Sequence, residues 1–167
     1  MAVDTSVIGK PTGAFKVRVE RGPVEFFATA VKDANPIYHD AAAAKAAGFA
    51  GIPAPPTFSF AMQHMGRFTE EQPEDPAGGD NPMHKVMGEI YAQGALILHG
   101  EQEFEYHRPI EVGDVLDGAG TLTDIYEKET DAATMTFVVV ETKWTDAATG
   151  EPVVTERFNL IARKKKG

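Results

Sequence analysis

The sequence predicts an α+β fold in which an antiparallel sheet is wrapped around a central helix. Apolar residues recur at helical spacing in the first half of the chain and at every second position in the second half. Between the two regions lies one stripe of apolar residues with little polar relief, which is typical of a helix surrounded by other structure. With 167 residues and 43% hydrophobic content, the chain is expected to form a single domain over residues 1–167.

The first half is expected to hold one strand and two helices. Alternation over residues 15–19 predicts a strand with one buried face. Pro23 suits the first turn of a helix, and Asn35-Pro36 brings that helical pattern to an end. Asp40 is then expected to cap a short helix over residues 41–47.

The middle of the chain is expected to contain a rigid loop, the central helix and a mobile loop. Three prolines over residues 51–56 predict the rigid loop, because proline fixes φ and has no N–H. The apolar stripe predicts the central helix from Thr57 to Phe68. Residues 69–83 are rich in Glu, Asp, Pro and Gly and are expected to form an exposed acidic loop.

Four further strands are expected to complete the sheet, with Gly and Asp turns between them. The segment 136–140 is apolar on both faces, which predicts a strand covered on both sides by a helix, another subunit or a second sheet. A basic tail is expected over residues 164–167. The predicted strands run over residues 98–107, 115–126, 134–145 and 153–163.

Composition excludes several classes of function. The formal net charge of -9 repels phosphate backbones and anionic lipids, so neither nucleic acid nor a membrane is an expected partner. The absence of cysteine excludes disulfides, thiolate metal sites and a cysteine nucleophile. No apolar run approaches the roughly 18 residues of a transmembrane helix, and no secretory signal is recognised. A soluble cytoplasmic protein is therefore expected.

The segment 33–40 is the strongest candidate for chemistry. It gathers two carboxylates, an amide, a tyrosine and a histidine in a loop between two predicted helices. Turn and cap roles alone account for Asp33, Asn35 and Asp40. A catalytic role is favoured because the central helix begins shortly after this loop, and the backbone amides and dipole at a helix start can polarise a carbonyl oxygen.

A second group of polar residues lies on the strand over residues 98–107. Simple alternation places His99 with Glu101 on the solvent face and Gln102 on the opposite face. His99 also lies near the strand start, where strand ends commonly line clefts. His99 and Glu101 are a weak metal pattern, because charged neighbours on an exposed strand face are much commoner than ligands. No metal site is expected.

These motifs resemble a known family. Asp-x-Asn-Pro followed by His, over residues 33–39, looks like the signature loop of MaoC-like (R)-specific enoyl-CoA hydratases, which have the hot-dog fold. AGIPAPPTF at residues 50–58 and LHGEQEFEYHRPIEVGDV at residues 98–115 extend the match. Together the three motifs are similar to the MaoC dehydratase N-terminal, or HadA-like, branch of acyl dehydratases.

The resemblance implies a five-stranded sheet around the central helix and hot dogs that pair sheet to sheet. It implies lyase chemistry of fatty acid metabolism, in which trans-2-enoyl-CoA and (R)-3-hydroxyacyl-CoA are interconverted by acid/base catalysis. No cofactor is implied beyond coenzyme A or acyl carrier protein as the carrier of the substrate. The acidic net charge favours coenzyme A over an acidic carrier protein.

The resemblance also assigns site residues. It makes Asp33 and His39 the catalytic acid/base residues and Asn35 a positioning group. The N–H of Thr57 is expected to bind the thioester oxygen at the start of the central helix. The remaining substrate-binding candidates are Tyr38, Pro56, Phe58, His99 and Gln102.

The sequence departs from the family pattern at two of these positions. Tyr38 stands where active hydratases have the catalytic His, so His39 is displaced by one position, and Pro56 stands where they have the oxyanion-binding Gly. Three functions therefore stay open. The chain is a self-sufficient hydratase/dehydratase acting as a homodimer, a non-catalytic substrate-binding subunit in a heterodimer with a second hot-dog chain, or a hot-dog acyl-CoA thioesterase.

Overall fold

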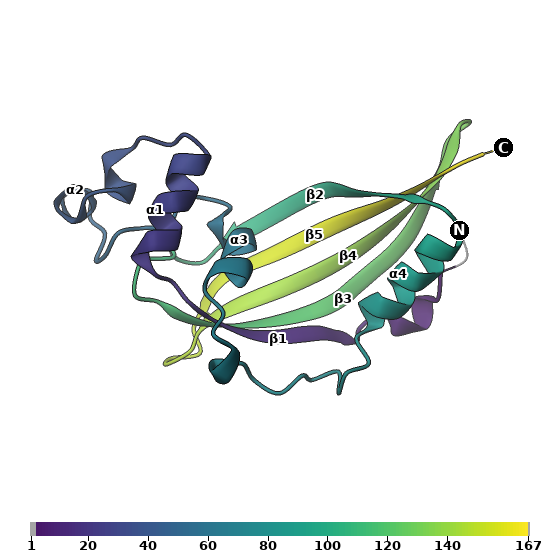
Figure 1. The fold of residues 1–167 in the computed structure, drawn as a ribbon, viewed down its shortest axis with the longest axis horizontal. Helices are drawn as coiled ribbons and strands as arrows, with labels where there is room; N and C mark the ends of the chain where they lie inside the picture. Colours follow the sequence, from purple (N-terminus) through teal and green to yellow (C-terminus); the bar gives the residue numbers. More distant parts are fainter. Residues whose placement is uncertain (1–2, 167) are drawn as a thin grey trace.

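The computed structural model describes residues 3–166 and contains one five-stranded antiparallel sheet in the order β1-β3-β4-β5-β2 (Figure 1). No helix in this part of the chain is both long enough and apolar enough to cross a membrane. The strands are β1 (Pro11–Arg18), β2 (Leu96–Tyr106), β3 (Val115–Glu129), β4 (Ala133–Asp146) and β5 (Pro152–Lys165). The helices are α1 (Arg21–Ala30), α2 (Ala41–Ala46), α3 (Phe58–Met65) and α4 (Pro82–Ala92), with short 3-10 turns η1 (Thr5–Val7), η2 (Pro36–Tyr38) and η3 (Thr69–Glu71).

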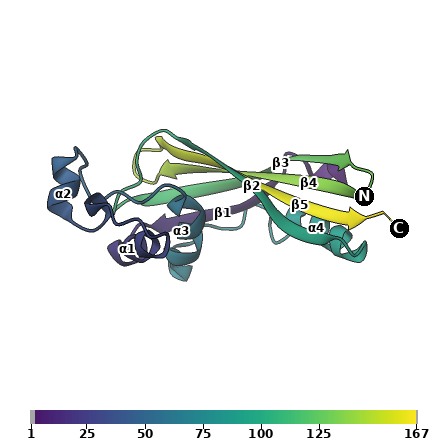
Figure 2. The same ribbon diagram turned by 90° about the horizontal axis from the view of Figure 1, so that it is seen from above.

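The helices gather on one face of the sheet, which we call the inner face. Figure 2 shows α1, α3 and α4 on this side, with α3 and α4 over opposite ends of the strands. The α+β class and the antiparallel five-stranded sheet that the sequence predicts are confirmed. The long, twisted strands thus form one continuous sheet surface, on which helices pack at two separate places.

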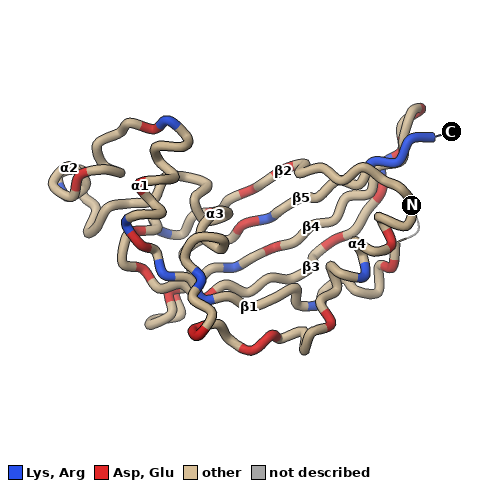
Figure 3. The backbone as a smooth tube through the Cα atoms, in the orientation of Figure 1, with Lys and Arg blue, Asp and Glu red and all other residues tan. Residues whose placement is uncertain are grey.

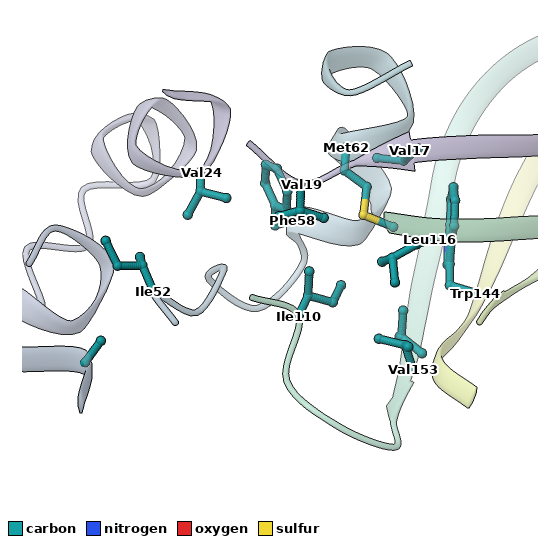
Figure 4. Packing of buried hydrophobic residues seen from close by; sticks show 12 residues of the cluster. Val17, Val19, Val24, Ile52, Phe58, Met62, Ile110, Leu116, Trp144 and Val153 are labelled. Atoms are coloured by element: carbon teal, nitrogen blue, oxygen red, sulfur yellow. The ribbon is translucent and has the colours of Figure 1, made fainter. Parts of the chain in front are cut away.

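Two hydrophobic clusters hold these helices against the sheet. Under α3, the buried side chains of Phe58 and Met62 pack with Leu116 and Trp144 of the sheet (Figure 4). Under α4, Val86 and Ile90 pack with residues of β3, β4 and β5. The spacing of four residues between Val86 and Ile90 places both on one side of the helix.

The α4 helix is absent from the sequence-based prediction, which placed the acidic loop up to Met83 and strands after it. Asn81 caps α4 by accepting a hydrogen bond from the N–H of Met83 at 2.9 Å, and Pro82 occupies the first helical position. Asn-Pro before a Val/Ile pair at helical spacing is the signal that predicts this helix. The central helix α3 is also shorter than predicted, because it ends at Met65 instead of Phe68.

The predicted acidic loop is partly anchored. The side chain of Gln72 donates to the carbonyl oxygens of Lys16 and Phe68, each at 2.9 Å, and accepts from the N–H of Lys16 at 3.1 Å. Beyond Gln72, acidic residues continue along the connection between α3 and α4 (Figure 3). The loop is therefore limited to residues 73–81, between Gln72 and the start of α4, and is shorter than the predicted 69–83.

The predicted basic tail is wrong for its first two residues. The strand β5 continues through Lys165, and Lys164 and Lys165 pair with Thr134 and Ala133 of β4. The N–H of Lys166 donates to the carbonyl oxygen of Ala132 at 3.1 Å, and its ammonium group pairs with Glu129 at 2.6 Å (Figure 3). Gly167 lies outside the described residues.

Only one face of the apolar segment 136–140 is covered within residues 3–166. Val138 is fully buried under α4, whereas the ring of Phe137 lies on the other face and stacks on Tyr126 with centroids 4.7 Å apart. On that outer face, Arg157 forms ion pairs with Glu103 at 2.9 Å and Glu141 at 2.8 Å. The outer face thus combines aromatic and ionic side chains, with no α-helix of the described chain over it.

Candidate functional site

The loop after α1 is built by the side chains that the sequence singles out. The carboxylate of Asp33 accepts a hydrogen bond from the N–H of Asn35 at 3.0 Å. The side-chain oxygen of Asn35 accepts from the N–H of Ile37 at 3.2 Å and caps η2. Such contacts two residues along the chain define Asx turns. Asp33 and Asn35 therefore use their side chains to shape the loop.

The imidazole of His39 faces the main chain of the same loop. Its Nε2 lies 3.0 Å from the carbonyl oxygen of Asp33. Because a carbonyl oxygen only accepts, Nε2 is the donor in this contact. The guanidinium of Arg21 donates to the carbonyl oxygen of His39 at 2.9 Å. His39 therefore contacts Asp33 through the backbone carbonyl of Asp33 and not through its carboxylate.

A cavity of about 380 Å³ opens beside this loop, and we call it the outer cavity. Its walls include Tyr38 of η2, Pro55 and Pro56 of the proline loop, and Tyr106 at the end of β2. Burial raises the pKa of Tyr38, and the negative charge of Asp33 raises it further. The Tyr38 phenol is therefore neutral at physiological pH and adds a hydrogen-bonding hydroxyl to a wall that also contains Tyr106, His107 and Arg108.

The start of α3 has an unusual backbone. Thr57 adopts a left-handed conformation with φ of 71°, and its N–H donates to the hydroxyl oxygen of Tyr106 at 2.9 Å. Pro56 has no N–H. The N–H of Phe58 donates to the carbonyl oxygen of Pro55 at 3.1 Å, and the Phe58 side chain is only 1% exposed in the hydrophobic core. Phe58 thus packs the core instead of lining a cavity wall.

A β-bulge corrects the predicted alternation of β2. The pairing of β2 with β5 shifts register between His99 and Glu101, so Gly100 is the extra residue. The shift turns His99 to the inner face, where its ring packs edge-on against Phe158 at 4.6 Å and Phe60 at 5.3 Å between centroids. A Cβ at Gly100 would collide with the side chain of Ile161. The bulge therefore depends on glycine.

Because of the bulge, His99 and Gln102 line one cavity. This inner cavity measures about 220 Å³ and lies between α1, α3 and β2, with Thr57, Phe60 and Ala61 also in its wall. Among the predicted site residues, the structure brings together Thr57, His99 and Gln102 at the inner cavity, and Tyr38 and Pro56 at the outer cavity. Asp33, Asn35 and His39 are not among the lining residues of either cavity.

Comparison with known proteins identifies the family. Residues 6–156 match the family described as "FAS1-like, dehydratase domain region". The chain belongs to this family. It is 36% identical over 166 residues to a UPF0336 protein of Saccharopolyspora erythraea, covering 98% of this chain and 93% of that one. It is 37% identical to a UPF0336 protein of Streptomyces avermitilis, covering 98% and 97% of the two chains.

Solved structures agree with this assignment and identify the fold as the MaoC-like hot dog. The ChsH1-ChsH2 complex from Mycobacterium tuberculosis matches with a TM-score of 0.75 and 26% identity, covering 95% of this chain and 86% of that chain. A MaoC-like dehydratase matches with a TM-score of 0.67 and 30% identity over 94% of this chain and 42% of that longer chain. The HadBC (3R-hydroxyacyl-ACP dehydratase) complex from Mycobacterium tuberculosis has the same fold, with a TM-score of 0.64, 21% identity and coverage of 94% and 98%.

The site predicted from the sequence does not include two residues of this FAS1-like dehydratase domain. Tyr106 holds the amide of Thr57, and Glu156 lies under α3 with only 3% exposure. The Glu156 carboxyl accepts hydrogen bonds from the Ser59 hydroxyl at 3.0 Å and from Trp144 Nε1 at 3.1 Å. Alternation along β5 puts Glu156 in phase with Val154 and Phe158, which is the signal that predicts its burial.

The buried Glu156 predicts a pH dependence of stability. Burial raises the pKa of this carboxyl in the folded state, although its two donors oppose the shift. An acid with a raised folded pKa binds more protons in the folded than in the unfolded state, so its contribution to stability is largest at low pH. That contribution is lost as the pH rises from the ordinary glutamate pKa of about 4.3 through the folded pKa.

We expect a Glu156→Gln variant to remove this dependence. In chemical denaturation from pH 4 to pH 8, the free energy of unfolding of the variant is expected to increase relative to that of wild type as the pH rises. Glutamine retains a carbonyl oxygen for Trp144 and an amide for Ser59, so the packing is kept. A difference between the two proteins that stays constant across this range would contradict the prediction.

Proposed function

We propose that this chain is the acyl-binding subunit of an acyl-thioester hydratase/dehydratase that is completed by a second hot-dog chain. The observation that carries the proposal is the start of α3. The Thr57 N–H is held by the Tyr106 hydroxyl, and Pro56 has no N–H to offer, so this position lacks an available amide donor for a thioester oxygen. A chain that binds the acyl group but leaves the chemistry to its partner has no need of that donor.

The loop around Asp33 supports the same division of roles. General acid/base catalysis requires the acid and base groups to face the substrate within hydrogen-bonding distance. Here the Asp33 carboxylate bonds the N–H of Asn35, and His39 Nε2 bonds the carbonyl oxygen of Asp33. Both groups are engaged with their own loop and lie outside the walls of the two cavities.

The partner is proposed to be another hot-dog chain. The ChsH1-ChsH2 complex, which shares 26% identity with this chain, consists of two differently named chains. In this protein β2 forms one edge of the sheet, and the side chains of Leu96, Leu98 and Tyr106 along it are exposed. An exposed edge strand with apolar side chains is suited to pairing with a second sheet.

In the proposed reaction, this chain orients the acyl thioester and excludes water from it. The inner cavity, walled by Phe60 and Phe104, accepts the acyl chain, and the outer cavity beside the proline loop accepts the thioester end. For dehydration, a base on the partner removes a proton from carbon 2 while an acid protonates the hydroxyl on carbon 3, which leaves as water. Hydration is the reverse, so the reaction interconverts a trans-2-enoyl thioester plus water and an (R)-3-hydroxyacyl thioester.

A self-sufficient hydratase/dehydratase is the second candidate. It is favoured by the gathering of Asp33, Asn35 and His39 in one loop next to Tyr38, which does line the outer cavity. In this case Tyr106 has to release the Thr57 N–H, and the His39 ring has to turn away from the Asp33 carbonyl. Tyr106 lines the outer cavity, and His39 directly follows Tyr38, another lining residue.

The test compares the purified chain alone with the chain mixed with a second hot-dog protein from the same source that has an intact Asp-x-Asn-Pro-x-His loop. Loss of trans-2-octenoyl-CoA is followed together with release of free thiol. We expect the chain alone to bind the thioester without converting it, and the mixture to hydrate it. We also expect His39→Ala in the mixture to leave the rate within about twofold.

Hydration by the chain alone, abolished by His39→Ala, would overturn the subunit proposal in favour of the self-sufficient enzyme. Thiol release without hydration would instead identify a thioesterase. Neither coenzyme A nor acyl carrier protein is assumed as the natural carrier. Octenoyl-pantetheine in a parallel assay reports how much of the affinity comes from the acyl chain.

A further inference from the structure

The side chain of Gln102 is a buried amide in an apolar setting. Both its Nε2 and its Oε1 are inaccessible to solvent, and neither has a hydrogen-bond partner within the described part of the chain. Buried polar groups are nearly always paired in folded proteins, so an amide with both ends unpaired requires an explanation. Its position on β2, between the bulge at Gly100 and Phe104, fixes it on the inner face.

Gln102 lies where two cavities meet. It lines the inner cavity of about 220 Å³, and with Phe60 it also lines a cavity of about 240 Å³, which we call the deep cavity. Its neighbours on the sheet are apolar, because Phe158 pairs with it across β5 and Phe104 follows it on the same face. The amide is thus a polar group among aromatic side chains that line both the inner and the deep cavity.

The deep cavity supplies further hydrogen-bonding groups. Glu156 and Thr142 contribute to its wall together with Gln63, whose amide donates to the carbonyl oxygen of Phe60 at 3.2 Å. An unbranched alkyl chain in this space has no hydrogen-bonding atom, so it would leave the Gln102 amide unpaired. A chain with an oxygen atom at the level of Gln102 would accept from Nε2, or donate to Oε1 if the oxygen belongs to a hydroxyl.

We propose that Gln102 selects acyl thioesters whose chain carries a hydroxyl or keto oxygen beyond carbon 3, where that oxygen pairs with the carboxamide. This inference rests on the proposed acyl-binding function and adds the substrate class. A site built to hydrogen-bond a substrate group discriminates against analogues that lack the group, because its own polar atoms are then left unpaired. Gln102 is accordingly a specificity residue and takes no part in the proton transfers.

The test measures binding and needs neither catalysis nor the partner. Calorimetry compares decanoyl-CoA with a set of decanoyl-CoA thioesters that carry one hydroxyl or one keto group at each position from carbon 4 to carbon 9. We expect at least one oxygenated isomer to bind wild-type protein about five- to tenfold more tightly than the unsubstituted chain. In Gln102→Leu we expect that preference to disappear, with decanoyl-CoA bound at least as tightly as by wild type.

Gln93→Leu is the matched control, because the amide of Gln93 donates to the carbonyl oxygen of Glu89 at 3.0 Å and the residue lines neither the inner nor the deep cavity. The preference for the oxygenated isomer is expected to survive in this variant. Gln102→Met repeats the test with an unbranched side chain if the Leu variant does not fold. Equal binding of all chains by wild type, or a preference that survives loss of the Gln102 amide, would overturn the inference while acyl binding stands. No binding of any decanoyl thioester would overturn the acyl-binding function itself.

Discussion

An Ala61→Trp variant is expected to bind medium-chain acyl thioesters at least tenfold more weakly than wild type, with the fold unchanged. Ala61 lies on α3, and its small side chain forms part of the wall of the inner cavity of about 220 Å³. An indole at this position occupies the space between α3 and β2 that the proposed function assigns to the acyl chain. Octanoyl-CoA binding, measured by calorimetry, reports the loss directly.

Short chains provide an internal comparison for this variant. Acetyl-CoA does not need the inner cavity, so its affinity is expected to change little. Ala42→Trp is the matched control, because Ala42 is exposed on α2 and lines neither the inner nor the outer cavity. Full octanoyl-CoA affinity in a well-folded Ala61→Trp protein would show that acyl chains bind elsewhere.

A Trp144→Ala variant is expected to lose about 3–5 kcal/mol of folding free energy. Trp144 is fully buried in the cluster under α3, where its ring packs against Phe15 with centroids 6.2 Å apart. Truncation leaves a large cavity and also removes the donor to Glu156. Because domains are stable by only about 5–15 kcal/mol, this change brings the protein close to global unfolding.

Equilibrium denaturation of three variants separates the contributions. Trp144→Phe keeps most of the ring volume but removes Nε1, so its loss is expected to fall well below that of Trp144→Ala. Tyr91→Ala removes an aromatic side chain that is 66% exposed on α4 and is expected to change stability by less than about 0.5 kcal/mol. A loss of under 1 kcal/mol for Trp144→Ala would mean that this cluster does not hold α3 to the sheet.

Much of the fold is predictable because its elements carry local signals. The Asp40 cap and the strand-forming alternation each have one dominant physical interpretation; the cap and the five antiparallel strands are confirmed, although simple alternation fails at the bulge of β2. The α4 helix is not predicted because its first turn follows an acidic segment, in which Asn81-Pro82 is equally typical of the end of a loop. The extension of β5 through Lys165 depends on pairing with β4, which a local sequence pattern does not contain.

The site is less predictable because it depends on contacts between distant segments. Alternation alone places His99 and Gln102 on opposite faces, and only the register against β5 reveals the bulge that unites them. The hydrogen bond between Thr57 and Tyr106 joins residues 49 positions apart and decides whether the amide is available. By contrast, the burial of Glu156 follows from its phase on β5 and was open to prediction.

The bulge at Gly100 also restricts which chains can assemble with this one. Within residues 3–166 the far side of β2 is an edge, and the bulge divides it into an apolar stretch over residues 96–99 and an acid-rich stretch over residues 101–106. Irregular, charged edges resist indiscriminate strand pairing and aggregation. A second sheet that joined here would have to follow the shifted register and offset the charges of Glu101 and Glu105, since Glu103 is already paired with Arg157, so this edge would disfavour mismatched chains before any substrate is bound.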